Sequence, residues 1–305
     1  MYYPILRGKL NELLALRELA SLSIDKKFCP VIEPVKGTFA PLFRTIRELN
    51  DKEITPLILM NPTVGDLAGN SLCVINEFKK EQGIRFIPAI AVKNTLEEVD
   101  NLINEFQDAE YALFLLDGLS TTTLEYSQKA HLTFISSTTA PNLINRLSNV
   151  VLYDSFFKKQ KRNADYPDES PFSSLHSYYK DIKNVIGFGD YTILSDEYSE
   201  NGGPAYVVTI HMTYINADKF DEAFVRHYSS ENDSDTPANP GKKFIEALEK
   251  FIIEKESKEI SFVETSGSDQ FQKIYDSEHF PGLGQVKKLS IMHHIETIND
   301  YLLSK

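Results

Sequence analysis

The fold is decided by residues 86–117, which read FIPAIAVKNTLEEVDNLINEFQDAEYALFLLD. Two apolar runs, residues 86–92 and 111–116, are each followed by a charged residue, Lys93 and Asp117. The residues between the runs carry apolar side chains at helical spacing. Short apolar runs are typical of strands buried on both faces, and an intervening helix is typical of a parallel β-α-β unit. This stretch therefore predicts a parallel sheet whose strands end in charged residues.

The same unit recurs about once per 25 residues over roughly the first 190 residues. We expect strands at residues 3–6, 28–32, 56–60, 86–92, 111–116, 132–135, 150–153 and 185–189. Helices are expected between them, including one that opens with the capping box Thr95-Leu96-Glu97-Glu98 and a last one near residues 172–183. This pattern predicts an α/β fold, a (β/α)8 TIM-like barrel.

An open doubly wound sheet is the alternative fold, because it has the same local pattern. We favour the barrel because the number of units matches, and because no glycine-rich dinucleotide-binding fingerprint opens the chain.

The pattern changes after Asp190, so we predict a barrel over residues 1–193 and a C-terminal α+β extension over residues 194–305, packed on the barrel. In the extension, residues 206–215 alternate as a half-buried strand does. Residues 229–240 are acidic and contain proline, which is typical of a mobile loop. Helices are expected near residues 220–228, 242–255 and 286–303.

The composition is that of an ordinary globular protein, with 305 residues, 42% of them hydrophobic, and a net charge of −12. Such an acidic chain is not expected to bind nucleic acid or anionic membranes non-specifically. No apolar stretch reaches about 18 residues, and the N-terminal residues do not have the pattern of a signal peptide. We therefore expect a cytoplasmic protein without membrane contact.

Charged residues follow many of the expected strands, and ligands of such barrels bind at the carboxyl ends of the strands. The candidate catalytic residues are the carboxylates Glu33, Asp117, Asp154 and Asp190. Carboxylates beside a lysine such as Lys93 can bind a cation, position a water, or act as an acid and base pair. The alternative is structural, because strand ends meet water and Asp caps helices.

A basic segment follows the seventh expected strand and is the candidate phosphate-binding loop. Its charged residues are Lys158, Lys159, Lys161 and Arg162. Acidic residues follow shortly, so the alternative is a solvated loop whose charges neutralise each other. No spacing of His, Cys or carboxylates indicates a metal site, and a divalent cation as cofactor stays open without an indication.

Several short motifs resemble the Beta protein family, which is named after a bacteriophage protein and occurs widely in bacteria, and within it the sce-type branch. The matching residues are Tyr3-Pro4-Ile5-Leu6-Arg7-Gly8-Lys9, Glu12, Ala15-Leu16, Val31-Ile32-Glu33-Pro34, Gly189-Asp190-Tyr191, the strand near Tyr206–Tyr214, and His293-His294. The resemblance supplies no activity. It implies a role in conflict between phages and bacteria, and a protein partner from the same gene neighbourhood. It also draws attention to Arg7, Lys9, Glu33, Asp190 and Tyr191. The chain has no tryptophan, whereas some relatives are expected to have one near the double histidine.

Together these observations lead to one functional hypothesis and one alternative. We expect a component of a phage-defence or phage-interaction system that binds a phosphorylated ligand or a nucleic-acid end at the barrel mouth, with hydrolysis of a phosphoester as the reaction that its carboxylates would support. The ligand-binding residues would be Arg7, Lys9, Lys93, Lys158, Lys159, Lys161, Arg162 and Tyr191. The alternative is a non-enzymatic scaffold that binds a protein partner through its C-terminal segment.

Overall fold

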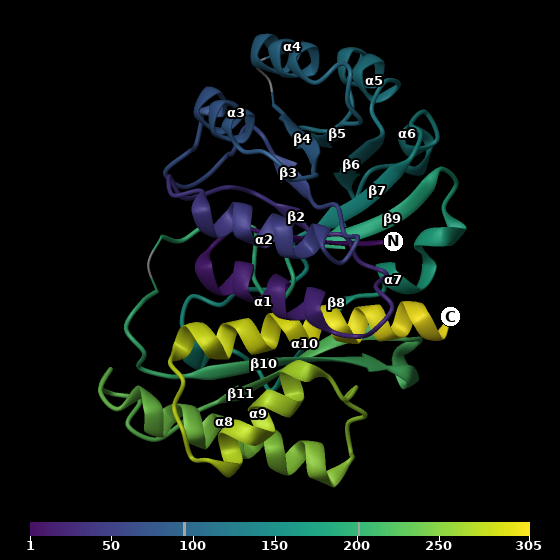
Figure 1. Ribbon diagram of the computed structural model, residues 1–305. Coiled ribbons are helices and arrows are strands. Elements are labelled where there is room, and N and C mark those ends of the chain that lie inside the picture. Colours follow the sequence, from purple (N-terminus) through teal and green to yellow (C-terminus); the bar gives the residue numbers. More distant parts are fainter. Residues whose placement is uncertain (94–95, 201) are drawn as a thin grey trace. The chain divides into compact units, whose positions relative to one another are not determined.

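A computed structural model describes residues 1–93, 96–200 and 202–305 (Figure 1). The contacts within the chain divide it into two compact units. The first unit comprises residues 1–154 and 178–191, and the second comprises residues 155–177 and 192–305. The capping box expected at residues 95–98 begins outside the described residues.

The first unit is a closed barrel of parallel strands, so the predicted TIM-like barrel is confirmed and the open sheet is not formed. Its strands in the described residues are β1 (Tyr2–Leu6), β2 (Val31–Ile32), β3 (Leu57–Leu59), β4 (Ile87–Val92), β5 (Ala112–Leu115), β6 (Leu132–Ser136), β7 (Val150–Asp154) and β9 (Val185–Asp190). The connecting helices are α1 (Leu10–Ser21), α2 (Ala40–Asn50), α3 (Ser71–Lys80), α4 (Leu96–Glu105), α5 (Thr121–Ser127) and α6 (Pro141–Ile144).

Aromatic side chains fill the interior of the barrel. The rings of Phe114 and Phe134 stack with centroids 4.0 Å apart, and Tyr3 meets Phe134 edge-on at 5.3 Å. Tyr153 packs against the same rings from β7. The interior is therefore a packed core, and any ligand of the barrel would bind at its ends.

Two glycines allow the barrel to close between β1 and β9. A Cβ atom on Gly187 would lie 2.6 Å from Cε2 of Tyr3, and one on Gly189 would lie 2.6 Å from the Tyr3 carbonyl oxygen. Larger residues would push β9 away from β1, where Tyr3 pairs with Gly189. These glycines therefore serve strand packing.

The second unit is built around an antiparallel sheet in the order β10-β11-β8. Its strands are β8 (Glu169–Ser173), β10 (Thr209–Asn216) and β11 (Glu222–Ser229). Helix α8 (Pro240–Ser257) packs against β10 and β11, and α10 (Leu283–Ser304) packs against β10 and α9 (Ser266–Asp276) (Figure 1). The predicted boundary placed residues 155–177 with the barrel, whereas in the structure they belong to this unit because β8 pairs with β11.

The helix predicted at residues 220–228 was wrong, because residues 222–229 form β11. Apolar residues recur there at helical spacing, but residues 222–229 pair with all eight residues of β10. Both faces of β11 are largely buried, so the alternation typical of a half-exposed strand is missing. The partner strand, and not the local pattern, selects the conformation.

The helix predicted at residues 172–183 was wrong over much of its length. Its first residues complete β8, and only a short helix α7 (Leu175–Tyr178) and a 3-10 turn (Tyr179–Asp181) follow. Helix α9 was not predicted at all.

Buried histidines join α10 to its neighbours. Carbonyl groups along a strand point alternately to its two sides. The Val208 carbonyl points toward the neighbouring strand, where it accepts from the Ser230 amide, so the carbonyl of Thr213, an odd number of residues further on, points away from β11. His293 Nε2 donates to that Thr213 oxygen at 2.8 Å, and His293 Nδ1 accepts from the Thr265 hydroxyl at 2.8 Å. Burial lowers the pKa of His293 to about 4, so the ring is neutral at pH 7. His293 thus caps the edge of the sheet.

Candidate functional site

The predicted catalytic residues all lie where barrel strands end. Glu33 follows β2 directly, Asp117 comes two residues after β5, and Asp154 and Asp190 are the last residues of β7 and β9. Arg7 and Lys93 directly follow β1 and β4. The barrel therefore brings these residues to its carboxyl end, as the sequence predicted.

A buried ion pair joins Arg7 to Glu33 at this end. Arg7 Nη1 donates to Glu33 Oε2, and the two residues are 9% and 2% exposed. The other oxygen, Glu33 Oε1, accepts from the Thr63 amide at 2.6 Å and from the Thr63 hydroxyl at 2.9 Å. Glu33 is therefore held as a carboxylate by donors from two directions, and it fixes the guanidinium of Arg7.

Tyr191 and the start of α1 complete the surroundings of Arg7. The Arg7 guanidinium carbon lies 4.9 Å from the centre of the Tyr191 ring, a cation–π distance. The Arg7 amide donates to Glu12 Oε2 at 2.5 Å. The next residue, Gly8, has a φ of 63°, and a Cβ atom there would lie 3.0 Å from the Glu33 carbonyl oxygen. Only glycine meets both conditions without strain. Lys9 follows at the N-cap position of α1 and is half-buried.

Asp154 and Asp190 accept hydrogen bonds from nearby residues. Asp154 Oδ2 accepts from the hydroxyls of Ser136 and Ser137 at 2.9 and 2.7 Å, and from the Ser137 amide at 3.1 Å. Asp190 Oδ1 accepts from the Tyr2 hydroxyl at 2.8 Å. Burial, together with the charge of Asp190, raises the pKa of Tyr2 well above its usual value, so Tyr2 stays a donor. These contacts are those of residues that fix strand ends.

Asp117 and Lys93 differ from the other members because both are exposed. They follow the neighbouring strands β4 and β5. No hydrogen bond or ion pair joins Asp117 to any residue that the structure describes. Asp117 is therefore the predicted catalytic carboxylate that is most accessible to a ligand.

The basic segment is not part of the barrel unit. Lys158, Lys159, Lys161 and Arg162 are exposed residues of the second unit. Lys159 pairs with Glu197 at 3.2 Å, and Arg162 pairs with Asp165 at 2.5 Å. The charges of these two residues are thus neutralised locally, as the solvated-loop interpretation expects.

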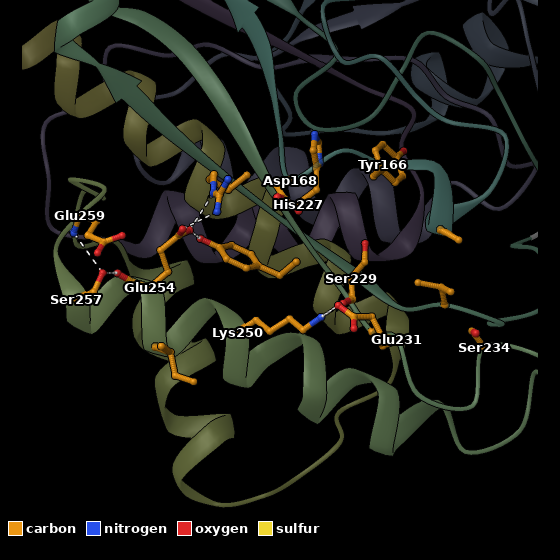
Figure 2. A pocket seen from close by; sticks show the side chains of 16 residues that line it. Tyr166, Asp168, His227, Ser229, Glu231, Ser234, Lys250, Glu254, Ser257 and Glu259 are labelled. Carbon is orange, nitrogen blue, oxygen red and sulfur yellow. Dashed lines mark hydrogen bonds and ion pairs between the residues drawn. The ribbon is translucent and has the colours of Figure 1, made fainter.

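The sequence did not reveal a cavity in the second unit. It has a volume of about 760 Å³ and lies beside β11 and α8 (Figure 2). Arg226 and Tyr228 line it from β11, and Lys250, Ile253 and Glu254 line it from α8. The helix wrongly predicted at residues 220–228 concealed this site, because only a strand places Arg226 and Tyr228 on one face.

His227 borders the cavity, but Figure 2 shows its ring pointing away from Lys250 and Ser229. On the other face, His227 Nε2 and Nδ1 lie 2.8 Å from the Ser170 hydroxyl and from Nδ1 of His211, respectively. Burial, and then the charge of Arg226, lowers the pKa of His227 to about 4. The Ser170–His227–His211 chain is therefore neutral at pH 7. Its rings pack against Phe157 and Tyr166, so it belongs to the core of the unit.

Within the described residues, no group of three or more His, Cys, Asp or Glu side chains is arranged to hold a metal ion. In the same part of the chain, no helix is long and apolar enough to span a membrane. Searches with family models, among curated proteins and among solved structures found no match to this chain.

Proposed function

We propose that the barrel binds a phosphorylated ligand or a nucleic-acid end at the carboxyl ends of its strands. The observation that carries this proposal is the guanidinium of Arg7, held by Glu33 and Tyr191 at the end where barrels of this class bind their ligands. A guanidinium has five donors in a planar fork that matches phosphate oxygens. An arginine fixed in advance loses less conformational entropy on binding than a mobile lysine does.

The hydrogen bonds of the carboxylates favour binding over catalysis. Glu33, Asp154 and Asp190 each accept from donors of the protein itself. A carboxylate must be accessible to accept a proton from a water or a leaving group. Asp117 meets this condition, so it is the residue that we assign to acid or base chemistry if a phosphoester is hydrolysed.

The biological setting comes from the resemblance to the Beta protein family alone. On that ground we place the binding activity in a phage-defence or phage-interaction system. A protein partner from the same gene neighbourhood belongs to this proposal.

The binding proposal can be tested with a fluorescein-labelled pentathymidylate that carries a 5′-phosphate, using fluorescence anisotropy. In the double variant R7Q/E33Q, two amides replace the buried ion pair, so no unpaired charge is left behind. We expect its affinity to fall at least about tenfold, because one charge-assisted contact contributes about 1.5–3 kcal/mol. Release of phosphate in the same samples, and its loss in D117N, would reveal hydrolysis.

The matched control is K36Q/D66N, which removes an exposed ion pair of the same unit with an N–O distance of 3.8 Å. Its affinity should equal that of the unchanged protein. Equal binding of oligonucleotides with and without the 5′-phosphate would contradict the proposal, and so would unchanged binding by R7Q/E33Q.

A further inference from the structure

The cavity beside α8 is a site that the proposed function leaves unused. We call it the α8 groove and define it by Asp168, Arg226, Tyr228, Lys250, Glu254 and Glu259, which line it. Its volume of about 760 Å³ is in the range of ligand-binding pockets. All its residues belong to the second unit.

Both cations of the α8 groove are already paired. Arg226 donates to both oxygens of Glu254, at 2.9 and 2.5 Å, and the Tyr228 hydroxyl donates to the same carboxylate. Burial opposes the charge of Arg226, but Glu254 outweighs this effect and raises the pKa of Arg226. Lys250 donates to Glu231 at 2.6 Å and to the Ser229 carbonyl at 2.8 Å. An anionic ligand would have to break these contacts.

Two carboxylates of the α8 groove have no such partner. The Glu259 amide donates to the Ser257 hydroxyl at 3.3 Å. Among the described residues, however, none donates a hydrogen bond to the carboxylate of Asp168 or Glu259 or forms an ion pair with it, and both residues are exposed. In Figure 2 they lie on opposite sides of Glu254. Glu231 lines the cavity as well, so the whole lining has four carboxylates and the two cations Arg226 and Lys250, and it carries a net negative charge. The groove is therefore complementary to a ligand with two separated positive charges.

The rest of the lining suits the side chains and backbone of a peptide. Ile253 is 59% exposed although it lines the groove, and the ring of Tyr228 lies on the same side of the sheet as α8, against Phe251. Lysine and arginine bury their apolar stems on such surfaces while the charged heads stay in water. Ser229, Ser234 and Ser257 add hydroxyls to the lining, which can bond peptide amides.

We propose that the α8 groove binds a basic, extended segment of a protein partner. Lysine or arginine heads would meet Asp168 and Glu259, and the stems would cover Ile253. The hydroxyls distinguish a peptide from a simple polyamine, which has no backbone carbonyl to accept from them. This binding uses no residue of the barrel, so it stands or falls separately from binding at Arg7.

Fluorescence anisotropy with a fluorescein-labelled octalysine peptide tests the proposal on the full chain. We expect saturable binding that weakens at least about tenfold in D168N/E259Q, because two charge-assisted contacts are lost. The matched control, D218N/E278Q, removes two exposed carboxylates of the same unit that do not line the groove. It carries the same net charge and should bind as the unchanged protein does.

Three results would overturn the proposal. The first is equal weakening in both double variants, which would mean that only the net charge attracts the peptide. The second is preference for octaglutamate, and the third is displacement of octalysine by spermine at equal charge concentration, which would assign the groove to polyamines. Circular dichroism would show that the exposed substitutions leave the fold intact, so a loss of binding reports on the groove itself.

Discussion

At the residue scale, the Arg7–Glu33 pair combines a large desolvation cost with an equally large attraction. Both side chains are nearly inaccessible, so neither charge is solvated by bulk water. Such a pair adds little net stability, but the loss of one partner leaves the other charge buried and unpaired. The pair therefore acts mainly by fixing where the guanidinium lies.

Substitutions of Arg7 and Glu33 should therefore have non-additive effects on the free energy of unfolding. Arg7→Met should lower the free energy of unfolding by about 3–5 kcal/mol, because Glu33 is left without its counter-ion. R7M/E33Q should lose less than R7M alone, since a neutral amide can still accept from Thr63. Urea unfolding measures both values. K36M, at the exposed pair with Asp66, should cost no more than about 1 kcal/mol, and additive effects at Arg7 and Glu33 would contradict the expectation.

At the element scale, the sequence predicted the barrel strands well because each one is a short apolar run between clear helical patterns. The placement of Arg7, Glu33 and Asp190 at strand ends follows from the same pattern. Their hydrogen-bond partners, such as Thr63 and Tyr2, could not be predicted, because Thr63 comes from the loop after β3 and Tyr2 from β1, both distant in the sequence from the residue that they bond. The α8 groove was missed for a related reason: β11 is buried on both faces and its identity depends on pairing with β10.

Helix α10 should make the stability of the second unit depend on pH through His293. Its pKa is about 4 in the folded chain and about 6.5 when unfolded. Between these values the unfolded chain binds the proton and the folded chain does not, so acidification destabilises the fold. The loss should approach about 3 kcal/mol as the pH falls from about 6.5 to about 4.

The variant H293Q isolates this contribution, because glutamine can bond Thr213 and Thr265 without titrating. Urea unfolding at a series of pH values measures the free energy of unfolding. Between about pH 6.5 and about pH 4, it should fall by about 3 kcal/mol less in H293Q than in the unchanged protein. His227 titrates in both chains and cancels in the difference. Parallel curves would show that His293 is protonated without cost in the folded chain.

At the scale of the whole molecule, the chain leaves the barrel after β7, contributes β8 to the other sheet, and returns to close the barrel with β9. A fragment of residues 1–193 has the predicted barrel boundary but lacks β11, on which β8 depends. We expect the amides of residues 169–173 to exchange rapidly in this fragment and slowly in the full chain. Hydrogen exchange measured by mass spectrometry would show this, and protection in the fragment would mean that β8 has another partner.

The same excursion of the chain has a consequence during synthesis. Every strand of the barrel has been made once Asp190 is complete, but β8 must wait for the last residue of its partner strand, Ser229, which follows Ser173 by 56 positions. At about 5–20 residues per second, the ribosome needs roughly 3 to 11 s to cover this distance. During that interval Phe157 and Phe172, both buried in the finished protein, are exposed on a nascent chain. A chaperone that binds apolar segments would find its target there.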